Sequence, residues 1–296
     1  MPSGNTSSAR GVLASQQASG RWGGLGLRVL SSLVLAPLAL AAIYLGTPWV
    51  DAFMAAAAML MAWEWSHLCN RGRGTGRAVL MIGVTAAALA ASVAHFFAIA
   101  LAVGVAGTLL VYLYVSWRDS RSDAARDLSA PAWTAAGVAW ISVPCAGFLW
   151  LRGLPEDGLV TALWLILVVW ATDIGAYVAG RSIGGPKLAP SISPGKTWAG
   201  LAGGVAAAAC VGYGVSQWVG ASPVAAIVGK SAVLAVAAQA GDLAESYVKR
   251  RFGAKDAGTL IPGHGGMLDR LDGFLAAVAV AALVAVLIGE SVFAWH

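Results

Sequence analysis

Long apolar runs separated by short polar segments fill this chain from residue 29 almost to its C-terminal end. A helix that crosses a bilayer needs roughly 17 to 25 predominantly apolar residues, and nine stretches approach or reach that length. They lie at residues 29–46, 49–68, 79–94, 96–117, 133–151, 159–180, 198–219, 223–246 and 274–293. The pattern predicts an all-α fold, a polytopic integral membrane helical bundle of about nine transmembrane helices.

The composition excludes a soluble protein. Of the 296 residues, 58% are hydrophobic and 11% are charged, and the mean hydropathy is +0.74. A soluble fold needs more polar residues than this to cover its surface. Cys69, Cys145 and Cys210 stand singly, without the spacing of a metal site, and we interpret them as small buried hydrophobic residues.

Three parts follow from the distribution of polar segments. Residues 1–27, rich in Ser, Gly, Gln and Ala, are expected to form a disordered cytoplasmic tail. Residues 28–155 hold the N-terminal transmembrane helices, and residues 156–296 hold the C-terminal ones with a cytoplasm-facing catalytic site. The apolar run after Arg28 also resembles a cleavable signal peptide, but the long polar leader and the charge pattern favour a first membrane helix.

Lys and Arg are concentrated in alternate loops. They precede the first apolar stretch and follow the second, fourth, sixth and eighth, whereas the loops on the other side hold only Arg152. Because Lys and Arg stay on the cytoplasmic side during assembly, the pattern predicts a multi-pass protein of the cell (inner) membrane with a cytoplasmic N-terminus. We interpret the Arg clusters at 71–77 and 118–126 as topology signals, and the mixed charges at 118–127 as a solvated loop.

The net charge of +5 predicts affinity for anionic membrane lipids rather than nucleic acid. The sequence holds no element that would read a nucleic-acid groove, so no nucleic-acid partner is expected.

Five acidic residues are not explained by topology, because they lie within the apolar stretches or at their ends. They are Asp173, Asp242, Glu245, Asp269 and Asp272. An ionised carboxylate in hydrocarbon is costly unless it is paired, binds a metal or faces water, so such a residue indicates function. All five are predicted at one membrane depth, on the cytoplasmic side.

Groups that suit phosphate surround these acids in the sequence. Basic residues are Lys187, Lys196, Lys249, Arg250, Arg251, Lys255 and Arg270. Glycines at 184–185, 258, 263 and 265–266 let backbone amides approach an anion closely. Asp242, Glu245, Ser246 and Lys249 share one helical face. Since Mg²⁺ takes one or two carboxylates plus phosphate oxygens, the combination predicts a divalent-metal site for a phosphoanhydride. The alternative for any single residue is a surface ion pair.

Two segments carry a resemblance to a known family. SYVKR at 246–250, KDAG at 255–258 and PGHGGMLDRLD at 262–272 resemble the long motif of phosphatidate cytidylyltransferases, also called CDP-diacylglycerol synthases. Asp173, Gly175, Tyr177 and Gly180, followed by SPGKTW at 193–198, resemble the second cytoplasmic segment of that family. The resemblance covers chiefly residues 170–274, and the WEW sequence at 63–65 agrees only loosely. Ala199 departs from it, because many relatives have Glu or Gln there.

The resemblance implies that CTP and phosphatidic acid react to CDP-diacylglycerol and pyrophosphate, with Mg²⁺ required, as one ion or two. The lipid phosphate is already ionised, so catalysis consists of bringing two polyanions together and neutralising charge. Implied metal ligands are Asp242, Asp269 and Asp272, with Asp173 as a further candidate. Implied catalytic residues are Asp242, Lys249, Asp269, Arg270 and Asp272. Implied substrate contacts are Lys187, Ser193, Lys196, Thr197, Ser246, Arg250, Lys255, Asp256 and His264.

Some residues keep two interpretations. His264, between glycines, either donates to a phosphate or caps a turn. Lys230 is expected to extend outward or to pair within the bundle. Glu64, His67 and His95 are interpreted as interface or core residues.

Two other functions would also use charges in a membrane bundle. A secondary transporter of an anionic solute places charge in broken helices, but its site should be reachable from both faces. A CTP-dependent lipid kinase uses similar groups and transfers the γ rather than the α phosphoryl group. The sequence leaves the oligomeric state open, a homodimer included.

Overall fold

The structure is a computed structural model that describes residues 31, 33–70, 75–121, 130–260 and 265–288. Nine helices and one two-stranded sheet are formed in this part of the chain. The helices are Leu33–Leu45, α2 (Trp49–Cys69), α3 (Thr75–Val93), α4 (Phe97–Ser120), α5 (Ala130–Arg152), α6 (Gly158–Ser182), α7 (Trp198–Val219), α8 (Val224–Arg251) and α9 (Leu268–Ile288). Seven of them, α3 to α9, are long and apolar enough to cross a membrane. The prediction of an all-α polytopic bundle is confirmed.

The predicted stretches and the observed helices differ mainly at two ends. α8 continues past residue 246 to Arg251, and α9 begins at Leu268 rather than at residue 274. The predicted ends were set by the apolar residues, but a helix can continue through polar ones. Three basic residues in the last turn of α8 also interact favourably with the helix dipole. Residues 246–250 and 268–272 of the long family motif are therefore helical.

The segment between α6 and α7 contains a hairpin that the sequence analysis did not predict. β1 (Lys187–Ala189) pairs antiparallel with β2 (Ser193–Thr197), with Lys187 opposite Thr197. Gly184 and Gly185, at φ 69° and 93°, turn the chain out of α6 in a conformation that favours glycine. These strands are short and lack apolar alternation, so the pattern carried no strand signal.

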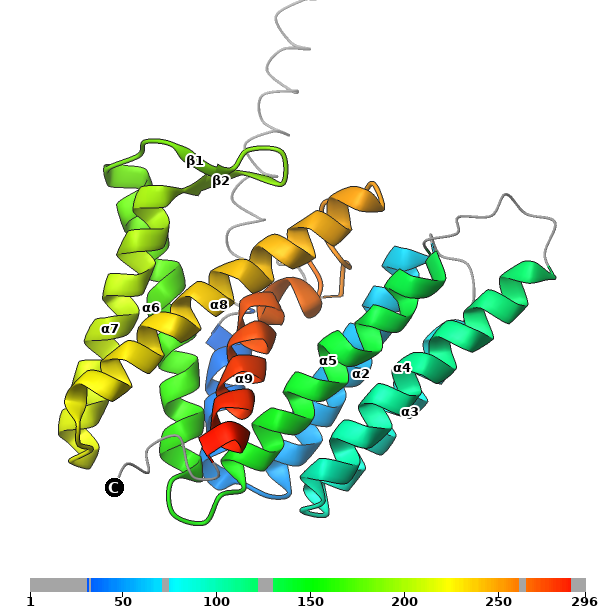
Figure 1. The fold of residues 1–296 in the computed structure, drawn as a ribbon, viewed down its shortest axis with the longest axis horizontal. Helices are drawn as coiled ribbons and strands as arrows, with labels where there is room; N and C mark the ends of the chain where they lie inside the picture. The colour runs from blue at the N-terminus through cyan, green and yellow to red at the C-terminus, as the bar shows by residue number, and fades with distance from the viewer. Residues whose placement is uncertain (1–30, 32, 71–74, 122–129, 261–264, 289–296) are drawn as a thin grey trace, which may run out of the picture.

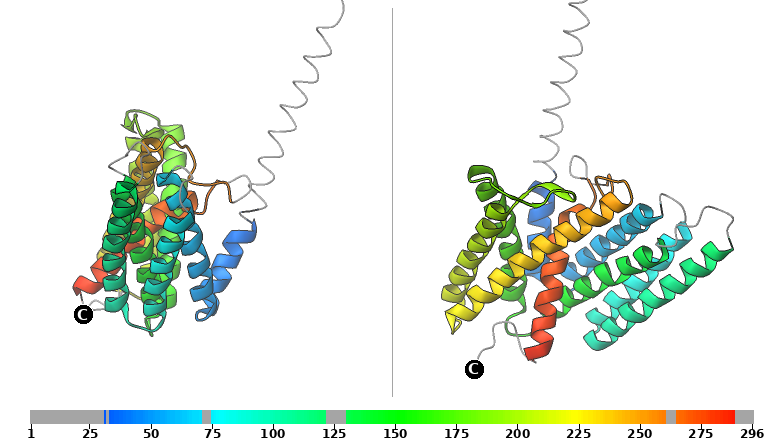
Figure 2. Two further views of the ribbon diagram at one scale, coloured as in Figure 1. Left: turned by 90° about the vertical axis from the view of Figure 1, so that its right-hand side faces the viewer. Right: turned by 45° about the horizontal axis from the view of Figure 1, so that its top comes forward.

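α8 crosses the molecule obliquely between two groups of helices. It contacts α7 on one side and α9 on the other, and Figure 2 shows the α6–α7 pair at one side of the molecule and α3 and α4 at the opposite side. The hairpin, the C-terminal end of α8 and the N-terminal end of α9 lie at the same end of the bundle (Figure 1). This arrangement brings the motif segments of the C-terminal half together.

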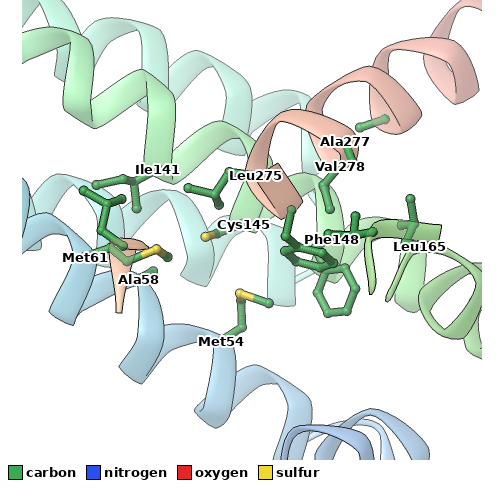
Figure 3. Packing of buried hydrophobic residues seen from close by; sticks show 14 of the residues in the cluster. Met54, Ala58, Met61, Ile141, Cys145, Phe148, Leu165, Leu275, Ala277 and Val278 are labelled. Carbon is green, nitrogen blue, oxygen red and sulfur yellow. The ribbon is translucent and has the colours of Figure 1, made fainter. Parts of the chain in front are cut away.

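The apolar core lies where α2, α5, α6 and α9 meet (Figure 3). Met61, Ile141 and Leu275 are buried there, and the rings of Phe148 and Phe274 contact edge to face with centroids 5.3 Å apart. Cys145 belongs to this core and Cys69 is also buried, as predicted.

The prediction of burial is wrong for Cys210, which is exposed on α7. α7 buries mainly a face of small residues, which include Gly200, Gly204, Ala208 and Gly212. Cys210 is not among the residues that α7 buries, so its thiol stays at the surface.

The predicted loop at residues 118–127 begins as part of a helix and contains an ion-paired residue. α4 continues to Ser120, and Asp119 forms an ion pair with Arg77 of α3, whose guanidinium also donates to Asn70. The interpretation of residues 118–120 as a loop is therefore wrong, because they belong to α4 and Asp119 joins two helices, whereas Arg121 follows the helix and is exposed. The predicted tail at 1–27 and residues 122–127 lie outside the described residues.

Candidate active site

Three of the five acids come together from three helices. Asp173 of α6, Asp242 of α8 and Asp272 of α9 lie close enough for their charges to repel one another, and the charge of Arg270 acts on Asp173. Within the described residues, no group of three or more acidic, histidine or cysteine side chains is arranged to hold a metal ion. The acids thus form a concentration of negative charge rather than a closed cage.

The hairpin positions a lysine beside this group of acids. Lys196 of β2 extends to α8, where its Nζ lies 2.7 Å from Asp242 Oδ2 and 3.4 Å from the carbonyl oxygen of Gln239. Ser246, one turn further along α8, donates to Asp242 Oδ1 at 3.2 Å. One carboxylate therefore has a lysine and a hydroxyl at its two oxygens, which are both groups that also bind phosphate.

A pocket of about 470 Å³ opens beside this lysine. This volume lies within the range of roughly 300 to 1,000 Å³ that is usual for small-molecule sites. Its lining includes Asp173, Gly180, Lys196, Thr197, Gln239 and Asp242. α6, β2, α7 and α8 all contribute, so the pocket exists only when the hairpin is folded against the helices.

A second charged centre joins α8 to α9. Lys249 is buried, and its Nζ lies 3.0 Å from Glu245 Oε1 and 2.7 Å from Asp269 Oδ1. The other oxygen of Asp269 accepts hydrogen bonds from the backbone amides of Ala257 at 2.8 Å and Gly266 at 2.9 Å. Both oxygens of Asp269 are therefore engaged with the protein, and this residue holds the segment between α8 and α9 in place.

Glu64, which was predicted to be an interface or core residue, reaches this segment from α2. It is 3% exposed. Its Oε1 accepts from the backbone amide of Met267 at 3.0 Å and its Oε2 from that of Leu268 at 2.9 Å. The signal that could have identified it is the one that identified Asp173, an acid within an apolar helix. No second acid stands near Glu64 in the sequence, so spacing alone does not link it to the other acids.

The remaining predicted site residues of the hairpin have mixed surroundings. Thr197 is buried and caps α7, because its Oγ1 accepts from the amide of Gly200 at 3.0 Å. Ser193 is half-buried, and Lys187 is exposed although it pairs with Thr197 in the hairpin. The structure thus brings Lys196 and Thr197 to the pocket and leaves Lys187 outside its lining.

Three further predicted residues are exposed at the end of α8 and just beyond it. They are Arg250, Lys255 and Asp256. Arg250 donates to the carbonyl oxygen of Ala254 at 3.3 Å. His264 lies outside the described residues.

Comparison with known proteins identifies a family over almost the whole chain. Residues 26–288 match the family described as "Cytidylyltransferase family". The chain is 37% identical to a phosphatidate cytidylyltransferase of Brucella suis over 267 residues, which covers 89% of this chain and 94% of the relative. It is 34% identical over 275 residues to a phosphatidate cytidylyltransferase of Pseudomonas aeruginosa, with 86% and 94% covered. For one of Haemophilus influenzae the identity is 30% over 292 residues, with 85% and 95% covered.

Proposed function

The chain belongs to the cytidylyltransferase family, and on this premise we propose that it is a phosphatidate cytidylyltransferase. It transfers the cytidylyl group of CTP to phosphatidate, and CDP-diacylglycerol and pyrophosphate are the products. A phosphate oxygen of the lipid bonds to the α phosphorus of CTP, and the bond from that phosphorus to the oxygen bridging to the β phosphorus breaks. The observation that carries this proposal is the pocket beside Lys196 and Asp242, at one end of an apolar helical bundle.

Mg²⁺ is the metal that these acids fit. Asp173, Asp242 and Asp272 offer hard oxygen ligands, and their mutual repulsion favours a bound cation. Mg²⁺ commonly binds through one or two carboxylates with water and substrate phosphates, so a protein cage of three ligands is not required. When bound, the ion neutralises charge on the phosphates. Asp269 remains a proposed ligand, through water or after it releases one of its present partners.

The basic side chains bind and orient the two anions. Lys196 lies at the pocket and Arg270 acts on Asp173, so these two are suited to contact phosphates nearest the acids. Lys249 already has two carboxylate partners and would contact phosphate only if it gave up one of them. The exposed residues Lys187, Arg250, Lys255 and Asp256, with Ser193, Thr197, Ser246 and His264, complete the proposed substrate contacts.

The proposed topology has nine spans and a cytoplasmic N-terminus. Leu33–Leu45 and α2, which has the same length as α9, join the seven long apolar helices. Basic residues of α3, α4, α6, α8 and α9 lie at the helix ends on the same side of the bundle as the site (Figure 1), and Arg152 lies in the last turn of α5. This distribution supports a site at the cytoplasmic face, where a two-tailed lipid can present its phosphate without leaving the membrane.

Isotope labelling of CTP tests the function. Purified protein in detergent micelles is given phosphatidate, Mg²⁺ and CTP with ³²P at the α position, and in a parallel reaction at the γ position. We expect labelled lipid only from α-labelled CTP. Labelled lipid from γ-labelled CTP would identify a lipid kinase, and solute flux in vesicles without consumption of CTP would identify a transporter.

A further inference from the structure

We propose that Glu64 is a positioning residue for the metal-binding acids: its carboxylate, on α2, fixes the N-terminus of α9 and through it Asp269 and Asp272. This inference rests on the proposed function, because it concerns the acids assigned there to the metal. It gives the N-terminal half of the chain a defined part in the site.

The contacts of Glu64 are those of a helix cap supplied from elsewhere in the chain. The first amides of a helix have no partner within the helix, and the N-terminal end of its dipole favours a negative charge. Glu64 accepts from the amides of Met267 and Leu268, one with each carboxylate oxygen. The bond to Leu268 is buried and that to Met267 is partly buried, and a charged acceptor makes both stronger than neutral ones.

Two glycines show how closely the chain is built around this carboxylate. A Cβ on Gly258 would lie 2.6 Å from Glu64 Oε1, and a Cβ on Gly266 would lie 2.6 Å from Glu64 Oε2. Neither glycine has its φ in the left-handed region. The backbone would therefore accept other residues at both positions, and the requirement for glycine comes from the space that Glu64 occupies.

The acids of α9 follow directly after the amides that Glu64 holds. Asp269 is the next residue after Leu268, and Asp272 lies one turn further on the same helix. Gly266, where a Cβ would collide with Glu64, also donates its amide to Asp269. A shift of this helix start would move both acids relative to Asp242 of α8. Small displacements of ligands and their supporting groups strongly reduce metal binding.

Direct metal binding tests the proposal. Mn²⁺ is titrated into the full-length protein in detergent without CTP and followed by EPR, and the Mg²⁺ dependence of turnover is measured in parallel. Glu64→Gln keeps the size of the side chain but turns an amide NH₂ toward one of the two backbone donors. We expect its Kd for Mn²⁺ and its half-saturating Mg²⁺ concentration to rise by about 10-fold or more. Glu64→Asp retains charge but is too short for both bonds, so an intermediate rise is expected.

The control is Asp51→Asn, which removes the other acid of α2 at the opposite end of that helix. It should bind Mn²⁺ as the wild type does. A folded Glu64→Gln variant with the metal affinity and Mg²⁺ dependence of the wild type would overturn the proposal. A wild-type protein that bound Mn²⁺ but transferred no cytidylyl group would instead refute the proposed function.

A second variant tests the proposal if Glu64→Gln does not fold. Gly258→Ala, in a segment outside the helices, keeps the Glu64 carboxylate but displaces it by collision. Gly229→Ala is the matched control, because a Cβ there meets nothing within 4 Å. Weaker Mn²⁺ binding in Gly258→Ala alone supports the proposal, and equal binding in both variants contradicts it.

Discussion

At the scale of single residues, the acids of the proposed site differ in their hydrogen-bond and ion-pair partners. Asp242 is bound on its two oxygens by side chains, Lys196 and Ser246, at a pocket. Asp269 accepts two backbone amides and the ammonium of a buried lysine. The same substitution is therefore expected to have different consequences at the two positions.

Asp→Asn at positions 242, 269 and 272 should each reduce metal affinity or activity by at least 10 to 100-fold, because a negative charge leaves the proposed metal site. Asp242→Asn should keep the Tm of the wild type, whereas Asp269→Asn should lower it, since the new NH₂ faces either the two backbone donors or the ammonium of Lys249. Turnover against Mg²⁺ concentration and thermal unfolding in detergent measure both effects. Raising Mg²⁺ should partly restore Asp242→Asn.

Glu156→Gln, at an exposed position between α5 and α6, is the matched control and should change neither quantity. Near-normal turnover at ordinary Mg²⁺ in all three Asn variants would refute the metal assignment. The acids would then be structural partners of the neighbouring basic residues.

Lys249 should matter for stability as well as for turnover. Its removal in Lys249→Ala leaves Glu245, which is fully buried, without the ammonium 3.0 Å away. Breaking a buried ion pair on one side typically costs about 3–5 kcal/mol. We therefore expect a large drop in Tm, partly reversed in the double variant Lys249→Ala/Glu245→Gln.

Thermal unfolding in detergent is the measurement, with the exposed Lys255→Ala as control. An unchanged Tm in Lys249→Ala would show that the lysine contributes to substrate binding and not to stability. The activity defect of the variant should then respond to substrate concentration more than to Mg²⁺ concentration.

At the scale of elements, the α6–α7 pair and its hairpin form one unit. The two helices approach through glycines: a Cβ on Gly203 would lie 2.3 Å from the Cβ of Ala179, and one on Gly175 would lie 2.6 Å from the carbonyl oxygen of Gly203. α6 carries Asp173, and the hairpin carries Lys196. Separation of the helices should thus disturb the pocket.

Gly203→Ala should lower the stability by about 1–3 kcal/mol, the usual cost of overpacking, and reduce turnover because Asp173 and Lys196 move apart. Gly214→Ala on the same helix is the control, since a Cβ there meets nothing within 4 Å. Tm and initial rate would be measured for both. Equal behaviour of the two variants would show that the helix pair can adjust without affecting the site.

At the scale of the whole molecule, the prediction concerns orientation. A single cysteine at Thr259, exposed between α8 and α9, should react with an impermeant maleimide only when the cytoplasmic face is accessible. A cysteine at Glu156 should react from the opposite face. The background needs Cys210→Ala, because this thiol is exposed, whereas Cys69 and Cys145 are buried. The reverse pattern would invert the proposed topology and place the site outside the cytoplasm.

The sequence alone determined the helices and the set of charged residues from which the proposed site is built. Apolar length follows from the thickness of the bilayer, so nine stretches predicted nine helices with small errors at their ends. An acid in an apolar run is costly wherever it stands, so Asp173, Asp242 and Asp272 were identified without coordinates.

Only the tertiary structure decided which partners those residues have. Lys196 reaches Asp242 through a hairpin that has no apolar alternation to predict it. Glu64 holds amides about two hundred positions away. Local sequence patterns reflect whether a segment faces lipid, water or the core. Contacts between helices depend on how the segments pack, and the separation of residues 64 and 267 in the sequence does not predict their contact.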